Sequence, residues 1–178
     1  MRHDRLGNAV SGSVEAVALL DDAVDRSLRH DGGVADAARA ATQADPSFAA
    51  AHAVLALADP VRSDAPVARA KALAQRSGTD YERSFVAFVD VLLERGMWAA
   101  LQPGIDHARA HPRDLLGVGL VGTMVERSTR VDVHDAVLAV YEPSRRELGD
   151  HPYLLCMVGF VVQEQGRFAE AGTMASRA

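Results

Sequence analysis

Residues 82–108, ERSFVAFVDVLLERGMWAALQPGIDHA, decide the fold of this chain. Numbered from residue 82, the segment has apolar residues at positions 4, 7, 8 and 11, a glycine at 15 and an aromatic residue at 17. Apolar or small residues follow at positions 20, 24 and 27. These residues are Phe85, Phe88, Val89, Leu92, Gly96, Trp98, Leu101, Ile105 and Ala108. The spacing predicts two antiparallel helices joined by a turn at Gly96.

Similar breaks recur along the whole chain. They lie at residues 32–33, 62–64, 96, 128–130 and 166, at intervals of about 31 to 37 residues. Asp-Pro or His-Pro pairs at 45–46, 111–112 and 151–152 mark helix starts, where proline needs no N–H partner. A period near 34 is that of the tetratricopeptide repeat. The sequence therefore predicts an all-α, right-handed α-α superhelix of about five tetratricopeptide-like hairpins.

The expected organisation is one repeat domain over residues 1–178. Its units fall roughly at 12–45, 46–78, 79–111, 112–150 and 151–178. The fifth unit fits the pattern best after the third, whereas the second is interrupted at residues 58–60. A small residue at position 8, such as Gly122 or Gly159, is expected to let the facing helix approach closely. The aromatic residue at position 17, Trp98 or Phe168, is expected to wedge its hairpin. A generic helical bundle is the alternative.

Composition limits the classes of function. The net charge of −5, with acidic residues scattered among the arginines, argues against a nucleic-acid partner. Cys156 is the one cysteine, which excludes an internal disulfide and suits a reducing compartment. The longest apolar run, residues 153–162, is too short to span a membrane. We therefore expect a cytoplasmic protein without a membrane partner.

The chain resembles the N-terminal half of the tetratricopeptide-repeat protein 38 family. The matching blocks include an Ala-Asp-Pro-x-Phe segment at residues 44–48 and a Glu-Arg pair at 82–83. Further blocks are LGNAVSGSVEAVALLDDAVDRSL, HPRDLLGVGLVG and HPYLLCMVGFVVQEQGRFAEA, in the order found in that family. The resemblance covers residues from about 6 to the end. It implies an interaction scaffold with no established activity.

Members of that family continue into further hairpins, so the resemblance implies a chain truncated inside its fifth unit. A repeat array needs a polar capping helix at each end. We therefore expect the last helix to be uncapped and open to self-association. The alternative function is that this chain is the N-terminal part of a helical enzyme or small-ligand-binding protein whose functional residues lie in a missing C-terminal half.

Several motifs suggest chemistry, but a structural role suits each one better. Residues 117–122, GVGLVG, match the G-x-G-x-x-G dinucleotide fingerprint, but too few residues separate Asp114 from Gly117 for the strand that the fingerprint requires. Instead, Asp114 is expected to cap a helix in which Gly122 is the small residue at position 8. We predict no phosphate site here.

The histidines and the cysteine are equally ambiguous. His107 and His111 are spaced i,i+4, as in some metal sites, with Asp106 and Asp114 as the only further ligands nearby. We interpret them as a surface pair and expect no metal and no cofactor. The His134-Asp135 pair lacks a nucleophile, and Cys156 lies in an apolar helix. The sequence therefore predicts no catalytic residues.

The predicted binding surface is the concave face of the superhelix. In this repeat, the first helix of each unit lines that face through positions 2, 5, 9 and 12. The candidate residues mix apolar side chains with charges of both signs: Arg83, Val86, Asp90, Leu116, Thr123, Glu126, Tyr153, Cys156, Phe160 and Gln163. The alternative is that Leu116, Cys156 and Phe160 belong to the core between repeats. We expect this groove to bind a peptide or a helical segment of a partner protein.

Overall fold

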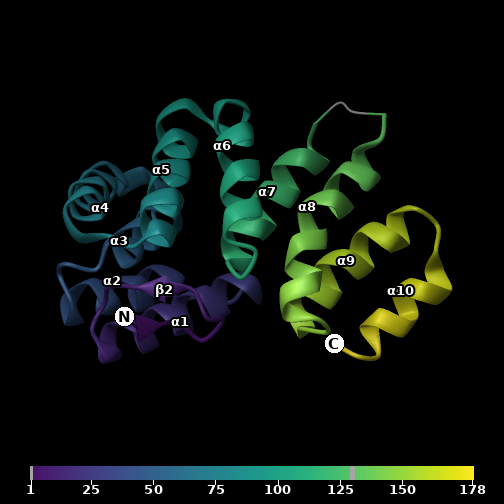
Figure 1. Cartoon of the computed structure of the whole chain (residues 1–178), viewed down its shortest axis with the longest axis horizontal. Helices are drawn as coiled ribbons and strands as arrows, with labels where there is room; N and C mark the ends of the chain where they lie inside the picture. Colours follow the sequence, from purple (N-terminus) through teal and green to yellow (C-terminus); the bar gives the residue numbers. More distant parts are fainter. Residues whose placement is uncertain (1, 129–130) are drawn as a thin grey trace. The chain divides into compact units, whose positions relative to one another are not determined.

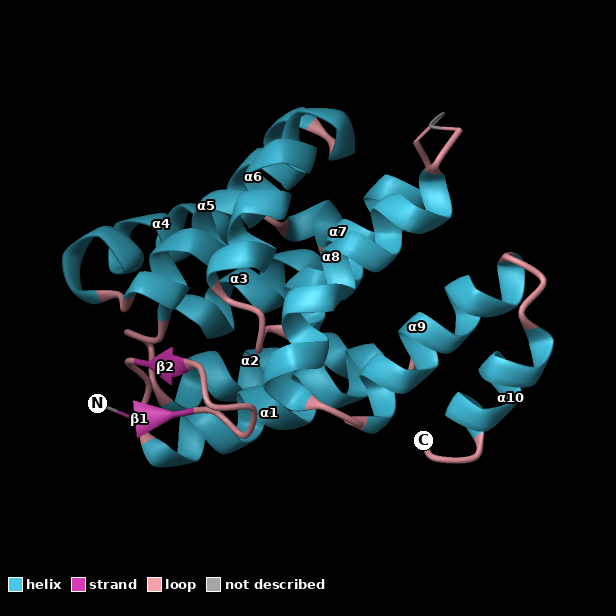
Figure 2. Cartoon of the chain, turned by 45° about the vertical axis from the view of Figure 1, so that its right-hand side comes forward, coloured by secondary structure: helices cyan, strands magenta, loops and turns pink. Residues whose placement is uncertain are grey.

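Helices account for almost all of the regular structure in the computed structural model, which describes residues 2–128 and 131–178. Within these ranges it has ten α-helices, one 3-10 turn and two short strands (Figure 2). The prediction of an all-α fold is confirmed. The chain forms two compact units, Met1–Pro103 and Gly104–Ala178. The division falls within helix α6 (Met97–Ala110).

The first unit begins with a β-hairpin that the sequence did not predict. Strands β1 (Arg2–His3) and β2 (Ala9–Val10) pair antiparallel. Five helices follow: α1 (Val14–Leu28), α2 (Val34–Ala44), α3 (Ala49–Ala58), α4 (Asp64–Ser77) and α5 (Asp80–Arg95). Each helix packs on the next, α3 also contacts α1 and α5, and β2 packs on α5 (Figure 1). The 3-10 turn Pro60–Arg62 occupies the predicted interruption.

The second unit contains four further helices. They are α7 (Leu115–Glu126), α8 (Val133–Leu148), α9 (Pro152–Glu164) and α10 (Phe168–Ala175). Each packs on the next, and α7 also contacts α9. Pro152 is the first residue of α9, and Gly166 takes a φ of 76° in the turn after it. The predicted break at Thr129 and Arg130 lies outside the described residues.

The predicted aromatic wedges do not close the hairpins. Trp98 and Phe168 are 59% and 70% exposed, so their predicted wedge role is wrong. In α6 the buried residues include Ala100 and Ala108, and in α10 they are Ala171 and Met174. An alanine-rich chain can bring helices together in this way without an aromatic side chain between them.

No helix within residues 2–128 and 131–178 has both the length and the apolar character needed to cross a membrane.

Asp45 joins the start of α1 to the turn between α2 and α3. Its carboxylate accepts hydrogen bonds from the backbone N–H of Ser13 at 2.8 Å and from the N–H and hydroxyl of Ser47 at 2.9 and 2.6 Å. Partial burial opposes ionisation, but the hydrogen bonds from Ser47 and Ser13 outweigh it and lower the pKa of Asp45. The Asp-Pro pair therefore does more than start a helix.

This lowered pKa predicts a pH-dependent contribution to stability. The ionised carboxylate stabilises the fold above about pH 4, and the contribution is lost as the pH falls through the folded-state pKa. We expect Asp45→Asn to be less stable than the wild type at neutral pH, with a difference that shrinks in acid. Urea unfolding between about pH 7 and 2 measures it, since the loss occurs below the ordinary carboxyl pKa. Asp36→Asn, at a surface ion pair, is the control. A gap that does not change with pH would contradict the prediction.

Gly122 provides a close helix contact, as its position in the repeat predicts, whereas a Cβ on Gly159 would make only ordinary van der Waals contacts. A Cβ built on Gly122 would lie 2.1 Å from the Tyr141 Oη and 2.6 Å from its ring. Gly159 faces α10, where Ala171 and Met174 lie 3.9 and 3.6 Å from a built Cβ. Burial and the charge of Glu126 raise the pKa of Tyr141 to about 12. Gly122 therefore makes room for a buried tyrosine on α8.

Two glycine-to-alanine changes should affect stability in opposite directions. Gly122→Ala forces the Tyr141 ring to move, and overpacking of this kind costs about 1–3 kcal/mol. Gly172→Ala, in α10, meets no atom within 4 Å and should gain about 0.5–1 kcal/mol from helix propensity. Urea denaturation of both variants tests the prediction. Equal stabilisation by the two changes would show that α7 and α8 do not approach as described.

Candidate functional site

Three of the predicted groove residues line one cavity in the first unit. The cavity has a volume of about 300 Å³ and lies between α4 and α5. Arg83, Val86 and Asp90 contribute to it from α5, as their i, i+3, i+7 spacing predicts. The remaining lining residues, which the sequence did not indicate, are Lys71, Ala74, Gln75 and Ala87. We call this cavity the α4–α5 groove.

Charged residues of both signs surround the small apolar residues of the α4–α5 groove. Lys71 Nζ on α4 lies 2.8 Å from Asp90 Oδ2 on α5. The hydrogen bond and the negative charge of Asp90 raise the pKa of Lys71. Arg83 donates to the Gly78 carbonyl and to the Asp80 carboxylate, and half of its side chain remains exposed. Val86 is only 2% exposed and Ala74 only 3%, so the accessible apolar surface of the groove comes from Ala87 and the stems of the charged side chains, whose polar groups already have partners.

A buried hydrogen-bond network fixes the start of α5. Glu82 is fully buried; its carboxyl group accepts from the Ser11 hydroxyl at 2.8 Å and from the Thr79 N–H at 2.9 Å. The Thr79 hydroxyl accepts from the Glu82 N–H and donates to the Ala9 carbonyl at 2.7 Å. This is a capping box joined to the N-terminal segment. In the Glu-Arg pair, therefore, Glu82 has a structural role and Arg83 lies at the surface.

In the second unit, most of the predicted groove residues are accessible. Thr123 and Glu126 on α7 are exposed, as are Cys156, Phe160 and Gln163 on α9, whereas Tyr153 is half-buried. Phe160 is 51% exposed and Leu116 is 8% exposed. The alternative core assignment therefore fits Leu116 but not Cys156 or Phe160. We call the exposed residues, with Tyr153, the α7–α9 face.

The G-x-G-x-x-G motif lies entirely within α7, and each glycine faces another side chain. A Cβ on Gly117 would lie 2.5 Å from Asp114 Oδ2, and one on Gly119 would lie 3.0 Å from Met157 Cε. Gly122 faces Tyr141, as described above. These glycines serve helix packing, which agrees with the prediction that the motif is not a phosphate site.

The prediction of a surface histidine pair at His107 and His111 is wrong. His107 is 1% exposed, and its Nε2 is joined to Asp114 Oδ2 by a 2.8 Å hydrogen bond. Asp114 is the N-cap residue of α7, but its side chain makes no capping bond, because it binds His107 instead. Residues 2–128 and 131–178 contain no group of three or more His, Cys, Asp or Glu side chains that could hold a metal.

Cys156 and the His134-Asp135 pair are the remaining candidates from the sequence. Cys156 is a free, exposed thiol. Asp135 accepts a hydrogen bond from the Gln165 side chain at 2.9 Å, which links α8 to the end of α9. That bond gives Asp135 a structural role on the surface of the second unit.

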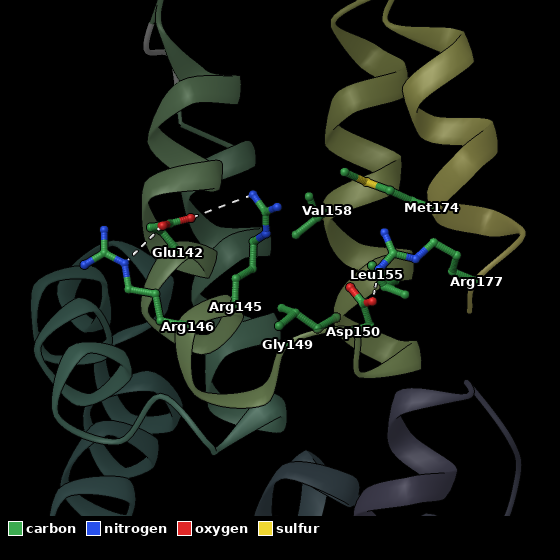
Figure 3. Close-up of a pocket in the computed structure, with 10 residues that line it drawn as sticks. Glu142, Arg145, Arg146, Gly149, Asp150, Leu155, Val158, Met174 and Arg177 are labelled. Atoms are coloured by element: carbon green, nitrogen blue, oxygen red, sulfur yellow. Dashed lines mark hydrogen bonds and ion pairs between the residues drawn. The ribbon is translucent and has the colours of Figure 1, made fainter.

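The sequence missed a second cavity. It lies between α8, α9 and α10, has a volume of about 310 Å³, and carries Arg145, Arg146 and Arg177 at its edge (Figure 3). Arg145 and Arg146 are neighbours in α8, whereas Arg177 lies more than thirty residues later, so the sequence carries no pattern that joins them.

Comparisons with protein-family models, with curated proteins and with solved structures found no match to this chain.

The His107–Asp114 pair should contribute measurably to stability. Asp114→Ala leaves the buried His107 nitrogen without this acceptor, and a loss of this kind costs about 1–3 kcal/mol. Asp106→Ala changes an exposed residue next to His107 in α6, and should alter the free energy of unfolding by no more than about 0.5 kcal/mol. Thermal and urea unfolding measure both. Equal small effects would show that the pair is not buried in solution.

Proposed function

We propose that this chain is a protein-interaction module of the tetratricopeptide type, which binds a peptide or helical segment of a partner protein. The observation that carries the proposal is the α4–α5 groove. It gathers Arg83, Val86 and Asp90, the residues that the repeat pattern assigns to the concave face, around one cavity. A cavity with an apolar floor and charged edges suits an amphipathic segment.

The order of helix contacts supports a superhelical arrangement within each unit. In the predicted repeat, the first helix of every hairpin stacks on the first helix of the next. Contacts of α3 with α1 and α5, and of α7 with α9, follow this rule. Stacked first helices would bring their exposed positions onto one face. Membership of the tetratricopeptide-repeat protein 38 family remains a prediction.

The α7–α9 face of the second unit is a separate candidate binding surface. Phe160 is a large aromatic side chain with half of its surface exposed, and Cys156 and Tyr153 lie about one and two turns before it on α9. Exposed aromatic side chains are enriched among the residues that dominate binding energy at protein interfaces. Thr123 and Glu126 of α7 supply hydrogen-bonding and charged groups on the neighbouring helix.

The two surfaces can be tested separately with charge changes that should preserve the fold. Peptides selected against the purified chain from a displayed library of helical sequences would serve as probes, with affinities measured by fluorescence anisotropy. We expect Arg83→Glu or Phe160→Asp to weaken binding by about tenfold or more, equivalent to roughly 1.4 kcal/mol. A glutamate at 83 lies near the N-terminus of α5, where a negative charge is tolerated.

Matched controls are available on each unit. Arg76→Glu changes an exposed arginine of α4 outside the groove, and Phe168→Asp changes an exposed phenylalanine of α10. Both should leave affinity and the helical circular dichroism signal unchanged. Full binding by both Arg83→Glu and Phe160→Asp, or equal loss in the controls, would refute the proposed surface.

A further inference from the structure

The cavity between α8, α9 and α10 combines an apolar wall with an excess of positive charge. Leu154, Leu155 and Val158 of α9 and Met174 of α10 supply the wall. Glu142, Arg145 and Arg146 line it from the end of α8, and Arg177 and Asp150 line it from the other side (Figure 3). All of these residues belong to the second unit.

The arginines that line this cavity outnumber its carboxylates. Asp150 pairs with Arg177 alone. Glu142 is shared between two arginines, at 3.1 Å from Arg146 Nε and 3.7 Å from Arg145 Nη1. The longer separation exceeds a normal hydrogen bond, so this contact is an ion pair only, and the half-exposed Arg145 guanidinium can turn its donors to a ligand. Three guanidinium groups and two carboxylates leave one positive charge in excess.

The position of Arg145 directs that charge towards the apolar wall. Figure 3 shows its side chain extending from α8 on the side of Val158, with Arg177 beside Leu155 on the other side of the cavity. A planar guanidinium binds a carboxylate through two parallel hydrogen bonds. A ligand that placed its anionic group at Arg145 would lay an attached apolar group against the accessible edges of Leu155 and Met174, which are 8% and 9% exposed, next to the buried Val158.

The two carboxylates limit how much negative charge the ligand can carry. Glu142 and Asp150 would repel a second negative charge on the ligand, so a dianion such as phosphate is disfavoured relative to a monoanion. A volume of about 310 Å³ lies at the lower end of the range for small-molecule sites.

We propose that this cavity binds a monocarboxylate that carries a compact apolar group, with the carboxylate on Arg145 and the apolar group on the wall formed by α9 and α10. The site is independent of the α4–α5 groove. Two sources share this chemistry: a free aliphatic acid and the C-terminal residue of a peptide with an apolar side chain.

Binding of defined probes to the full chain tests the proposal. Octanoate should shift the Met174 methyl resonance with a Kd below about 1 mM. Acetate, which lacks the apolar group, octylammonium, which reverses the charge, and inorganic phosphate should each bind at least about tenfold more weakly. An acetylated tripeptide ending in leucine, compared as free acid and as amide, separates the two sources. Preference for octanoate indicates a free acid, and preference for the peptide acid indicates a chain terminus.

Substitutions at Arg145 and at Arg113 distinguish binding in this cavity from a general effect of removing positive charge. Arg145→Gln should weaken binding of the preferred probe, octanoate or the peptide acid, by about tenfold or more. Arg113→Gln removes an ion-paired arginine of the same unit outside the cavity, and should leave affinity unchanged. Arg145→Lys keeps the charge but loses the planar fork; it should give an intermediate affinity and serves if the glutamine variant does not fold.

The proposal is overturned if neither octanoate nor the peptide acid shifts Met174 at about 10 mM. It is also overturned if octylammonium or phosphate binds as tightly as octanoate, or if Arg113→Gln weakens binding as much as Arg145→Gln.

Discussion

The buried carboxyl group of Glu82 is the constraint on which the first unit depends. A carboxyl group removed from water costs several kcal/mol unless hydrogen bonds replace its solvation. Ser11 and Thr79 supply those bonds, and Thr79 also binds the Ala9 carbonyl. The start of α5 is thereby fixed to the N-terminal strand segment. Since this start sets the rotation of the helix, it decides that Phe85, Phe88 and Val89 are buried while Arg83 and Asp90 reach the groove.

In the second unit, a buried His–Asp pair and two glycines fix the position of α7. Asp114 and His107 form a buried pair, and Gly117 leaves the space that the pair occupies. One turn later, Gly122 admits Tyr141 from α8. The glycines weaken α7 as an isolated helix by roughly 1 kcal/mol each. In return, they let polar side chains lie close to the backbone and hold α7 in place beside its neighbours.

Much of the fold could be predicted because its signals are local. Gly96 and Gly166 lie in turns between helices and Pro152 begins α9, as predicted, whereas α3 and α7 begin only at Ala49 and Leu115, three residues after their prolines. The capping role of Glu82 was hidden in the Glu-Arg pair, although a threonine three residues before a glutamate is a recognisable signal. Exposure of Trp98 and burial of His107 depend on how far neighbouring helices extend, which no spacing along a single helix reveals.

The candidate sites also differ in how far the sequence could predict them. Arg83, Val86 and Asp90 share a face of one helix, so periodicity alone brings them together. Arg145 and Arg177 meet only because α8, α9 and α10 fold back on one another, and their separation in the sequence carries no information about it.

The two cavities also recognise ligands by opposite means. In the α4–α5 groove, Lys71 and Asp90 satisfy each other across the two helices, so apart from its contact with the half-exposed Arg83 a ligand is selected mainly by shape and apolar contact. In the cavity of α8–α10, one carboxylate serves two arginines, and the charge left over attracts an anion before shape matters. Affinity at the groove should therefore vary little with salt, whereas affinity at the arginine cavity should fall as ionic strength rises.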